Sequence, residues 1–408
     1  MPFLALRRFL GVAPGQIKHL VAPASILKCA LAFLLLIVFA SACSPELLPV
    51  PVTQVSTAVP ASPPAVGPTG ALTDPRALVS IRMFDERSGW GISQTSVLRT
   101  ADSATTWHTA GPSTGEASGY TVTSYFLDAA HGWILVPVPN DMLHGILYRS
   151  SDGGVSWMES PAPFGDGQLH FVDARRGWMM ATLGAGAGSM GIAVFQTQDG
   201  GATWTQSYTN DPNQPEAGSS LPLGGLKNGI AATSIEKAWI GGVTYAPGTV
   251  YLYQTVDGGR SWTKSPVQAP AGYEQAELQT AGPVFVDAGI AYLPVHLSSQ
   301  NGVLLAIYLS RDGGASWLLS PELIPQGGPM DFVSAQTGFV WNGTNFYATK
   351  DAAQSWTVVT PDLAFGDTFS GMDFVTPQVG FVLRTDASGI ASLYKTVDGA
   401  ATWTLAGN

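Results

Sequence analysis

Short apolar stretches separated by polar turns recur along the chain after residue 77, and none of them has the period of an amphipathic helix. Each recurring unit contains an apolar run such as Phe171-Val172-Asp173, a polar turn, and then a small residue followed by an aromatic one, as in Gly177-Trp178. Runs of this composition between turn residues predict β-strands. The first residues of the apolar elements are Met83, Phe126, Phe171, Ala231, Phe285, Phe332 and Phe374.

A second motif follows each of these elements and has four shared positions. A Ser or Thr stands two residues before an Asp, another Ser or Thr stands just before a Trp, and the Trp comes five residues after the Asp. An Asp at the head of a tight turn accepts backbone N–H bonds two residues on, and a following Gly adopts positive φ without strain. The motif therefore predicts a locked hairpin, and its seven copies contain Asp102 and Trp107, Asp152 and Trp157, Asp199 and Trp204, Asp257 and Trp262, Asp312 and Trp317, Asp351 and Trp356, and Asp398 and Trp403.

The two motifs together define a repeating unit of four strands. One strand precedes each Asp and another starts at each Trp, and successive Asp residues are 39 to 58 residues apart. This spacing fits four-stranded propeller blades. The sequence therefore predicts an all-β fold, a seven-bladed β-propeller of four-stranded antiparallel blades over residues 78–408, with every blade complete in sequence order and no strand exchanged at the closure.

The N-terminal segment has the pattern of an export signal. Basic residues precede the apolar run from Ala30 to Phe39, and small residues lead to Cys43. This pattern predicts a signal peptide over 1–42. The small residues before a cysteine resemble the bacterial lipobox, which implies lipid on Cys43 and a protein held at the extracytoplasmic face of the cell membrane. The alternative is an uncleaved membrane anchor from Leu20 to Ala42. Residues 43–77, rich in Pro, Ala, Ser and Thr, are expected to be an extended tether.

Composition and charge narrow the function classes. Charged residues make up only 12% of the chain, with 47 Gly and 29 Pro, which favours short strands and turns. A net charge of −10 argues against a nucleic-acid partner. The only cysteines, Cys29 and Cys43, lie in the N-terminal segment, so the body has no thiolate site. The histidine spacing supports no metal site, and no cofactor motif is present.

The second motif resembles the Asp-box, or BNR repeat, of exported propellers. Both motifs together resemble the photosystem II assembly and stability factor family, and also sortilin-like and sialidase-like propellers. The resemblance implies a non-catalytic binding or assembly scaffold outside the cytoplasm, with a protein or glycan partner and membrane attachment through the lipid. The alternative is a glycan-active or glycan-binding propeller.

The sialidase resemblance implies three convergent arginines and an Arg-Ile-Pro segment, and the sequence has no Arg-Ile-Pro. Most arginines of the body fall in or near turns, and only Arg82 and Arg384 are expected near the propeller axis or the variable face. We therefore expect no enzyme activity. A carboxylate pair at the channel mouth, involving Asp141, Glu274 or Asp386, keeps the glycosidase alternative open.

The face opposite the predicted Asp hairpins of the second motif is expected to carry function. In a four-stranded meander it receives the loops between the second and third strands and the linkers between blades, and these are the segments of variable length here. Loops on a rigid scaffold usually carry binding. The candidate binding residues are Asp141, His144, Tyr245, Tyr273, Glu274, His296, Trp341 and Arg384. In contrast, Asp85, Asp128, Asp173 and Asp287 recur at one blade position, which predicts turn caps.

Overall fold

The structure is a computed structural model that describes residues 70, 72–93, 95–112, 122–300 and 302–407. By its internal contacts the chain divides into two units, Met1–Ala61 and Ser62–Asn408, and every described residue belongs to the second. The expected signal peptide 1–42, Cys43 and most of the expected tether lie outside the described residues. Within the described ranges, no helix has the length and apolar character needed to span a membrane.

The described chain is all-β, and four of its sheets are antiparallel with four strands each in sequence order. Short polar turns between apolar runs produce these meanders, as the sequence pattern predicts. Their strands are β6 (Thr123–Phe126), β7 (Gly132–Val138), β8 (Asp141–Ser150) and β9 (Met158–Ala162); β10 (Gly167–Phe171), β11 (Gly177–Gly186), β12 (Ser189–Thr197) and β13 (Thr205–Thr209); β24 (Met330–Phe332), β25 (Gly338–Trp341), β26 (Phe346–Thr349) and β27 (Thr357–Val359); and β28 (Phe369–Phe374), β29 (Gly380–Thr385), β30 (Ala391–Thr396) and β31 (Thr404–Leu405).

A fifth sheet has one strand more than the sequence predicts. Its order is β1-β5-β4-β3-β2, so a short N-terminal strand lies outside the meander. Leu72 and Thr73 pair with His108 and Trp107, although this segment was expected to be tether. The added strand satisfies backbone groups along an otherwise open sheet edge. The elements are β1 (Leu72–Thr73), the 3-10 helix η1 (Pro75–Ala77), β2 (Leu78–Met83), β3 (Gly89–Ser93), β4 (Val97–Thr100) and β5 (Trp107–Thr109).

A linker strand joins two further meanders into one ten-stranded sheet. The linker strand β18 pairs with β15 through Gln279 and Val243, and with β20 through Gln279 and His296. From its sequence this linker was expected to be a loop. The strands are β14 (Leu226–Ala232), β15 (Ala238–Val243), β16 (Tyr251–Thr255), β17 (Thr263–Lys264), β18 (Glu277–Gln279), β19 (Val284–Phe285), β20 (Ala291–Ser299), β21 (Gly302–Ser310), β22 (Leu318–Leu319) and β23 (Ile324–Pro325); a second 3-10 helix, η2 (Gly366–Thr368), precedes β28.

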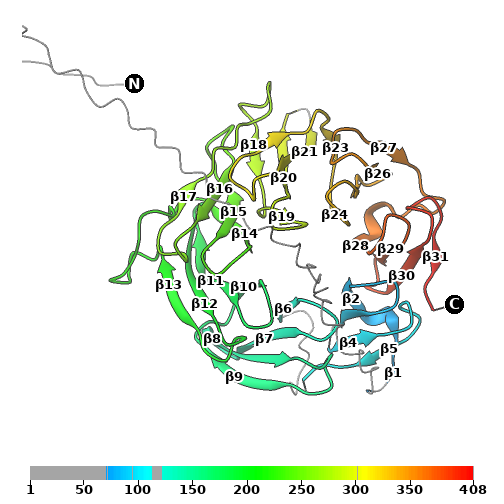
Figure 1. Ribbon diagram of the computed structural model, residues 1–408, viewed down its shortest axis with the longest axis horizontal. Helices are drawn as coiled ribbons and strands as arrows, with labels where there is room; N and C mark the ends of the chain where they lie inside the picture. The colour runs from blue at the N-terminus through cyan, green and yellow to red at the C-terminus, as the bar shows by residue number, and fades with distance from the viewer. Residues whose placement is uncertain (1–69, 71, 94, 113–121, 301, 408) are drawn as a thin grey trace, which may run out of the picture. The chain divides into compact units, whose positions relative to one another are not determined.

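The meanders follow one another around a common centre, with the first strand of each nearest to it (Figure 1). Strand β10 contacts both β6 and β14, and β28 contacts both β24 and β2. The hydrophobic core is therefore distributed between neighbouring sheets. One cluster, for example, combines Trp178 and Val194 with Ile230 and Ile240 of the next meander.

Aromatic stacking across sheet boundaries explains the first sequence motif. The aromatic residue of a second strand stacks on the Phe that opens the next unit, as Trp133 does on Phe171 with ring centroids 3.7 Å apart. The residue before that aromatic is commonly Gly because the Phe of its own unit lies over it. A Cβ added at Gly338 would lie 2.5 Å from the ring of Phe332. The stacked or tilted pairs are Trp90–Phe126, Trp133–Phe171, Trp239–Phe285, Tyr292–Phe332 and Phe339–Phe374.

Each Asp of the second motif closes a hairpin, which we call an Asp turn. In the Asp turn of Asp199, the carboxylate accepts the backbone N–H of Thr203 at 2.9 Å and its hydroxyl at 2.7 Å. Thr197 donates its hydroxyl to Asp199 and accepts the N–H of Gly201. The backbone donor is four residues after the Asp and not two as expected, because the turn is longer than a simple Asx turn. The same carboxylate bonds to backbone N–H and hydroxyl occur in the other six Asp turns, which are those of Asp102, Asp152, Asp257, Asp312, Asp351 and Asp398.

The recurrent Asp of the first motif caps the turn between first and second strands. Asp173 accepts the N–H groups of Arg175 and Arg176 at 2.8 and 2.7 Å. Equivalent pairs of bonds reach Asp85, Asp128 and Asp287. The predicted turn-capping role of these four acids is confirmed.

Candidate functional site

One residue of each innermost strand stands immediately before the recurrent apolar residue, and we call this set the axial residues. Several reach across the boundary to the backbone of the next sheet. Asp331 accepts the N–H of Phe374 at 2.5 Å, and Asp373 accepts the N–H of Met83. These bonds fasten neighbouring sheets to one another. The axial residues are Arg82, Tyr125, His170, Ile230, Val284, Asp331 and Asp373.

Tyr125 and His170 make the same kind of hydrogen bond between two other pairs of neighbouring sheets. The hydroxyl of Tyr125 donates to the carbonyl of Phe171 at 2.9 Å, and Nε2 of His170 lies 3.0 Å from the carbonyl of Ala232. Burial lowers the pKa of His170 to about 4, so its imidazole is neutral at pH 7 and donates from Nε2. Burial raises the pKa of Tyr125. Both groups are held in the forms that make these structural bonds.

Arg82 carries the exposed charge of the set. Its Nη1 lies 2.9 Å from the carboxylate of Asp373, and its side chain is 54% exposed whereas that of Asp373 is 4% exposed. Burial raises the pKa of Asp373 to about 7, against the opposing effect of the Arg82 charge and with a further rise caused by Asp331. Burial also raises the pKa of Asp331. Arg82 therefore compensates a buried acid on one side and presents its guanidinium to solvent on the other.

A cavity of about 580 Å³ lies against these axial residues. Arg82, Tyr125, Gln168 and His170 line one part of it, and small residues of β14 and of the segment before β19 line another. The two backbones approach closely there, since a Cβ at Gly229 would meet the carbonyl of Ala281 at 2.1 Å. The cavity thus combines the cationic Arg82 and the exposed, anionic Asp287 with a wall of small, mostly apolar residues.

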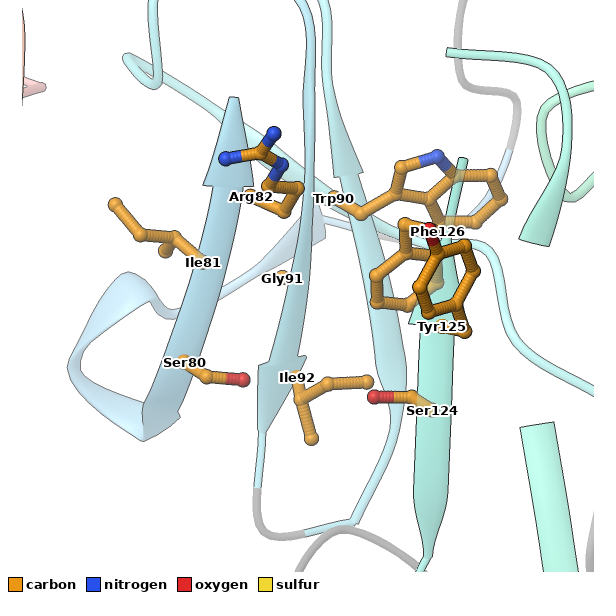
Figure 2. Close-up of a pocket in the computed structure, with 9 residues that line it drawn as sticks. All are labelled: Ser80, Ile81, Arg82, Trp90, Gly91, Ile92, Ser124, Tyr125 and Phe126. Carbon is orange, nitrogen blue, oxygen red and sulfur yellow. The ribbon is translucent and has the colours of Figure 1, made fainter. Parts of the chain in front are cut away.

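A second cavity, of about 350 Å³, lies between β2, β3 and β6. Figure 2 shows Arg82 and Trp90 near one end of it, and Ser80, Ile92 and Ser124 near the other. Arg82 and Tyr125 line both cavities. Arg82, expected from sequence near the axis or the variable face, therefore stands where the two cavities meet.

Asp141 and His144, two of the predicted binding-face residues, form an exposed pair, with Nδ1 of His144 2.8 Å from the carboxylate of Asp141. His144 also lines a cavity of about 170 Å³ together with residues of the following sheet. Tyr245 is 67% exposed, and its ring lies against Gly188, where an added Cβ would be 2.4 Å away. These positions are accessible to a partner.

Tyr273, Glu274, His296 and Arg384 are held by local contacts. Tyr273 is partly buried in a core cluster, and Glu274 accepts the N–H of Gly272 within its own loop. His296 lies in β20, where burial lowers its pKa. Arg384 donates from Nε to the hydroxyl of Thr368 at 2.7 Å.

Trp341 is a core residue, which corrects its assignment to the exposed face. It is only 3% exposed and lies among the rings of Phe346, Phe365 and Phe369. A large aromatic side chain gains most by leaving water in this way. Of the eight predicted residues, only His144 lines one of the cavities described here.

Tyr125, His170, Asp331 and Asp373 were not among the residues predicted from the sequence to form a site. Their signal is positional: each stands one residue before the recurrent apolar residue, where alternation along an innermost strand turns the side chain away from the core. Within the described ranges, no group of three or more His, Cys, Asp or Glu side chains is arranged to hold a metal ion.

Solved structures with similar folds include propeller proteins of different activities. YCF48 bound to D1 peptide aligns with a TM-score of 0.51 and 17% identity over 81% of this chain and 95% of its own. A polysaccharide lyase of family 25, an ulvan lyase, aligns with a TM-score of 0.50 and 11% identity over 83% of this chain and 97% of its own. No protein-family model and no curated protein matches the chain. At these identities the likeness shows the β-propeller fold alone.

Proposed function

We propose that this protein is a non-catalytic binding or assembly scaffold outside the cytoplasm, built on a seven-bladed propeller of Asp-box repeats and anchored through lipid on Cys43. Seven Asp turns with one hydrogen-bond pattern support the blade number. The ten-stranded sheet then counts as two blades that β18 joins. A protein or glycan is the partner, and nucleic acid is disfavoured by the net charge of −10.

The scaffold proposal rests on one observation: most polar axial side chains are already hydrogen-bonded to the protein's own backbone. Tyr125, His170, Asp331 and Asp373 each bond to the backbone of a neighbouring sheet. A general acid or base must instead reach the substrate proton directly or through one water. The arrangement leaves Arg82 as the exposed cation at the two cavities that it lines, whereas the carboxylate of Asp287, which also lines the larger cavity, caps its own turn. A guanidinium suits recognition of an anionic or hydrogen-bond-accepting group.

Glycan processing is the second candidate. The ulvan lyase shares the fold at a TM-score of 0.50, and the axial pair Asp331 and Asp373 has raised pKa values, which is common for catalytic acids. The burial of Asp331 and Asp373 between neighbouring sheets also accounts for their raised pKa values. We therefore rank this candidate below the scaffold.

Affinity capture with the full-length chain in detergent tests the scaffold proposal. Arg82→Gln removes the exposed charge and keeps hydrogen-bond donors for Asp373, while Arg175→Gln removes an exposed charge from a turn elsewhere. A partner retained by the natural protein should bind at least about tenfold more weakly to the Arg82 variant, equivalent to about 1.4 kcal/mol, and normally to the Arg175 variant. Tyr245→Ala tests, in the same assay, the face opposite the Asp turns, which we call the loop face. If both the Arg82 and the Tyr245 variants bind the partner normally, neither surface is the site.

A panel of sialosides, β-glucans and uronate polymers tests the enzymatic candidate. We expect no turnover by the purified protein. Turnover that Asp331→Asn or Asp373→Asn abolishes, without loss of the folded state by circular dichroism, would replace the scaffold proposal with a glycan-active enzyme. The same result with Asp141→Asn or Glu274→Gln would place the activity at the loop face.

A further inference from the structure

On the Asp-turn side, one equivalent position in each repeat faces the space between neighbouring sheets. We call these seven positions the gap positions. Each stands one residue before the first Ser or Thr of an Asp turn and opposite the aromatic residue of the second strand, as Arg99 pairs with Trp90 and Ala348 with Phe339. Most gap positions carry long side chains. They are Arg99, Arg149, Gln196, Gln254, Leu309, Ala348 and Lys395.

Arg99 shows how a guanidinium occupies such a gap. Its side chain is fully buried, with the guanidinium carbon 4.7 Å from the centre of the Trp90 ring. Nη1 donates to the carbonyl of Gly89 at 3.0 Å. On the other side, a Cβ at Gly153 of the next sheet's turn would lie 3.8 Å from Nε of Arg99 and 3.3 Å from the carbonyl of Ala129. The slot therefore offers an aromatic face, a carbonyl acceptor and a glycine wall.

The gap between the β24–β27 and β28–β31 sheets is open because position 348 is alanine. A cavity of about 390 Å³ lies there, and its lining includes Phe339, Ala348, Pro377 and Gly399. In register these residues correspond to Trp90, Arg99, Ala129 and Gly153 of the filled slot. Gly338 likewise stands where Gly89 supplies its carbonyl. The open gap thus repeats the walls of the arginine slot without the arginine.

The charges around the open gap favour a cation. Asp351 and Asp398 line it, and so does Lys350. Hydrogen bonds from Ser355 and Thr402 lower the pKa of these two acids, so both are ionised at neutral pH. The lining therefore carries one negative charge more than positive charge, within a chain whose net charge is −10.

We propose that this open gap binds the guanidinium of an arginine side chain presented by a partner polypeptide. The planar group takes the place over Ala348 that corresponds to the Arg99 guanidinium, against the small accessible part of Phe339, which is 2% exposed, and donates to backbone carbonyls. Because little of the Phe339 ring is accessible, its contact with the cation is weaker than that of Trp90 with Arg99, so the site needs the rest of the partner for tight binding. The site lies on the side of the Asp turns, away from the loops and the axial cavity, and does not depend on the proposed function.

Short arginine compounds test the proposal directly. The full-length protein in detergent is titrated with N-acetyl-arginine amide, N-acetyl-lysine amide and N-acetyl-citrulline amide, and binding is measured by calorimetry and located by crystal soaking. Citrulline keeps the shape of arginine but not the charge. We expect arginine amide to bind with a Kd of about 1–10 mM, the range for a small fragment contact, and at least fivefold more tightly than the other two compounds.

Two variants fill the gap, and one adds the same charge outside it. Ala348→Arg and Ala348→Gln should abolish arginine binding, and Ala348→Arg should also raise the melting temperature. Val358→Arg, on an exposed position of β27, should change the Kd by less than twofold. Equal affinity for all three compounds, no saturable binding at tens of millimolar, or unchanged binding by a folded Ala348→Gln protein would each overturn the proposal.

Discussion

Trp133 and Trp204 provide a matched test of which tryptophans hold the sheets together. Trp133 belongs to a second strand and is 2% exposed. Its Nε1–H donates to the carbonyl of Gly200 in the next sheet at 2.8 Å, and its ring stacks on Phe171. Trp204, from an Asp turn, is partly buried; its Nε1 is buried without a partner among the described residues.

The different surroundings of Trp133 and Trp204 predict different losses of folding free energy on replacement by alanine. Removing Trp133 empties a core site, which costs about 3–5 kcal/mol, and leaves the Gly200 carbonyl without its donor, which adds about 1 kcal/mol. Trp204 loses its edge contacts with Phe164 and Phe171, at 5.1 and 6.0 Å between ring centroids, and an unpaired N–H disappears with it. We therefore expect Trp204→Ala to cost about 2–3 kcal/mol, below the full range for buried aromatics.

Guanidinium chloride denaturation followed by tryptophan fluorescence and by circular dichroism measures both variants. The two probes must give the same midpoint for the free energies to be comparable. Trp133→Phe serves as a control that keeps the stacked ring but not the N–H donor, and it should recover most of the loss. A cost below about 1 kcal/mol for Trp133→Ala, or a larger cost for Trp204→Ala than for Trp133→Ala, would refute the reasoning.

Three further predictions concern pH, glycine and anchoring. Because the folded pKa of His170 is about 4, below the unfolded value of 6.5, the unfolded state gains a proton first as pH falls from 6.5 to 4. The natural protein should therefore lose up to about 3 kcal/mol relative to His170→Gln over this window; parallel stability curves would contradict this. Gly338→Ala should destabilise the fold by about 1–3 kcal/mol through its clash with the Phe332 ring, while Gly371→Ala, in open space, changes little; equal effects on the denaturation midpoint would exclude the clash. Cys43→Ser should release the protein from washed membranes, and a variant that stays in the pellet would favour the uncleaved anchor.

Most of the features that could be predicted from the sequence alone lie within single repeats. Some features depend only on residues within five positions of one another and can therefore be predicted from the sequence. These are the Asp turns and the turn caps at Asp85, Asp128, Asp173 and Asp287. The strand meanders can be predicted for the same reason. The sequence pattern did not reveal β1 or β18, because each is a two- or three-residue strand whose pairing partner lies far away in sequence.

The axial residues were harder to predict because their partners come from the next repeat. Asp331 and Asp373 look like ordinary strand acids until the neighbouring backbone N–H groups of Phe374 and Met83 are placed against them. The prediction for Trp341 was wrong for the same reason. Its position at the end of β25 suggested a loop, but Phe365, next to η2, and Phe369 of β28 lie against its ring. Contacts between repeats, rather than within them, decide these positions.

The outer strand β1 determines how the fold would respond to a pulling force. Leu72 and Thr73 pair with the outermost strand of their meander, β5, and not with a strand of the last sheet (Figure 1). A pull applied through the N-terminal segment would therefore load these few backbone bonds, and the bond from His108 to Gly70, first. The junction between β2 and β28, where Arg82, Met83 and Asp373 meet, would remain unloaded until β1 had peeled away. The short strand β1 would therefore detach at a lower force than the sheets need to separate from one another.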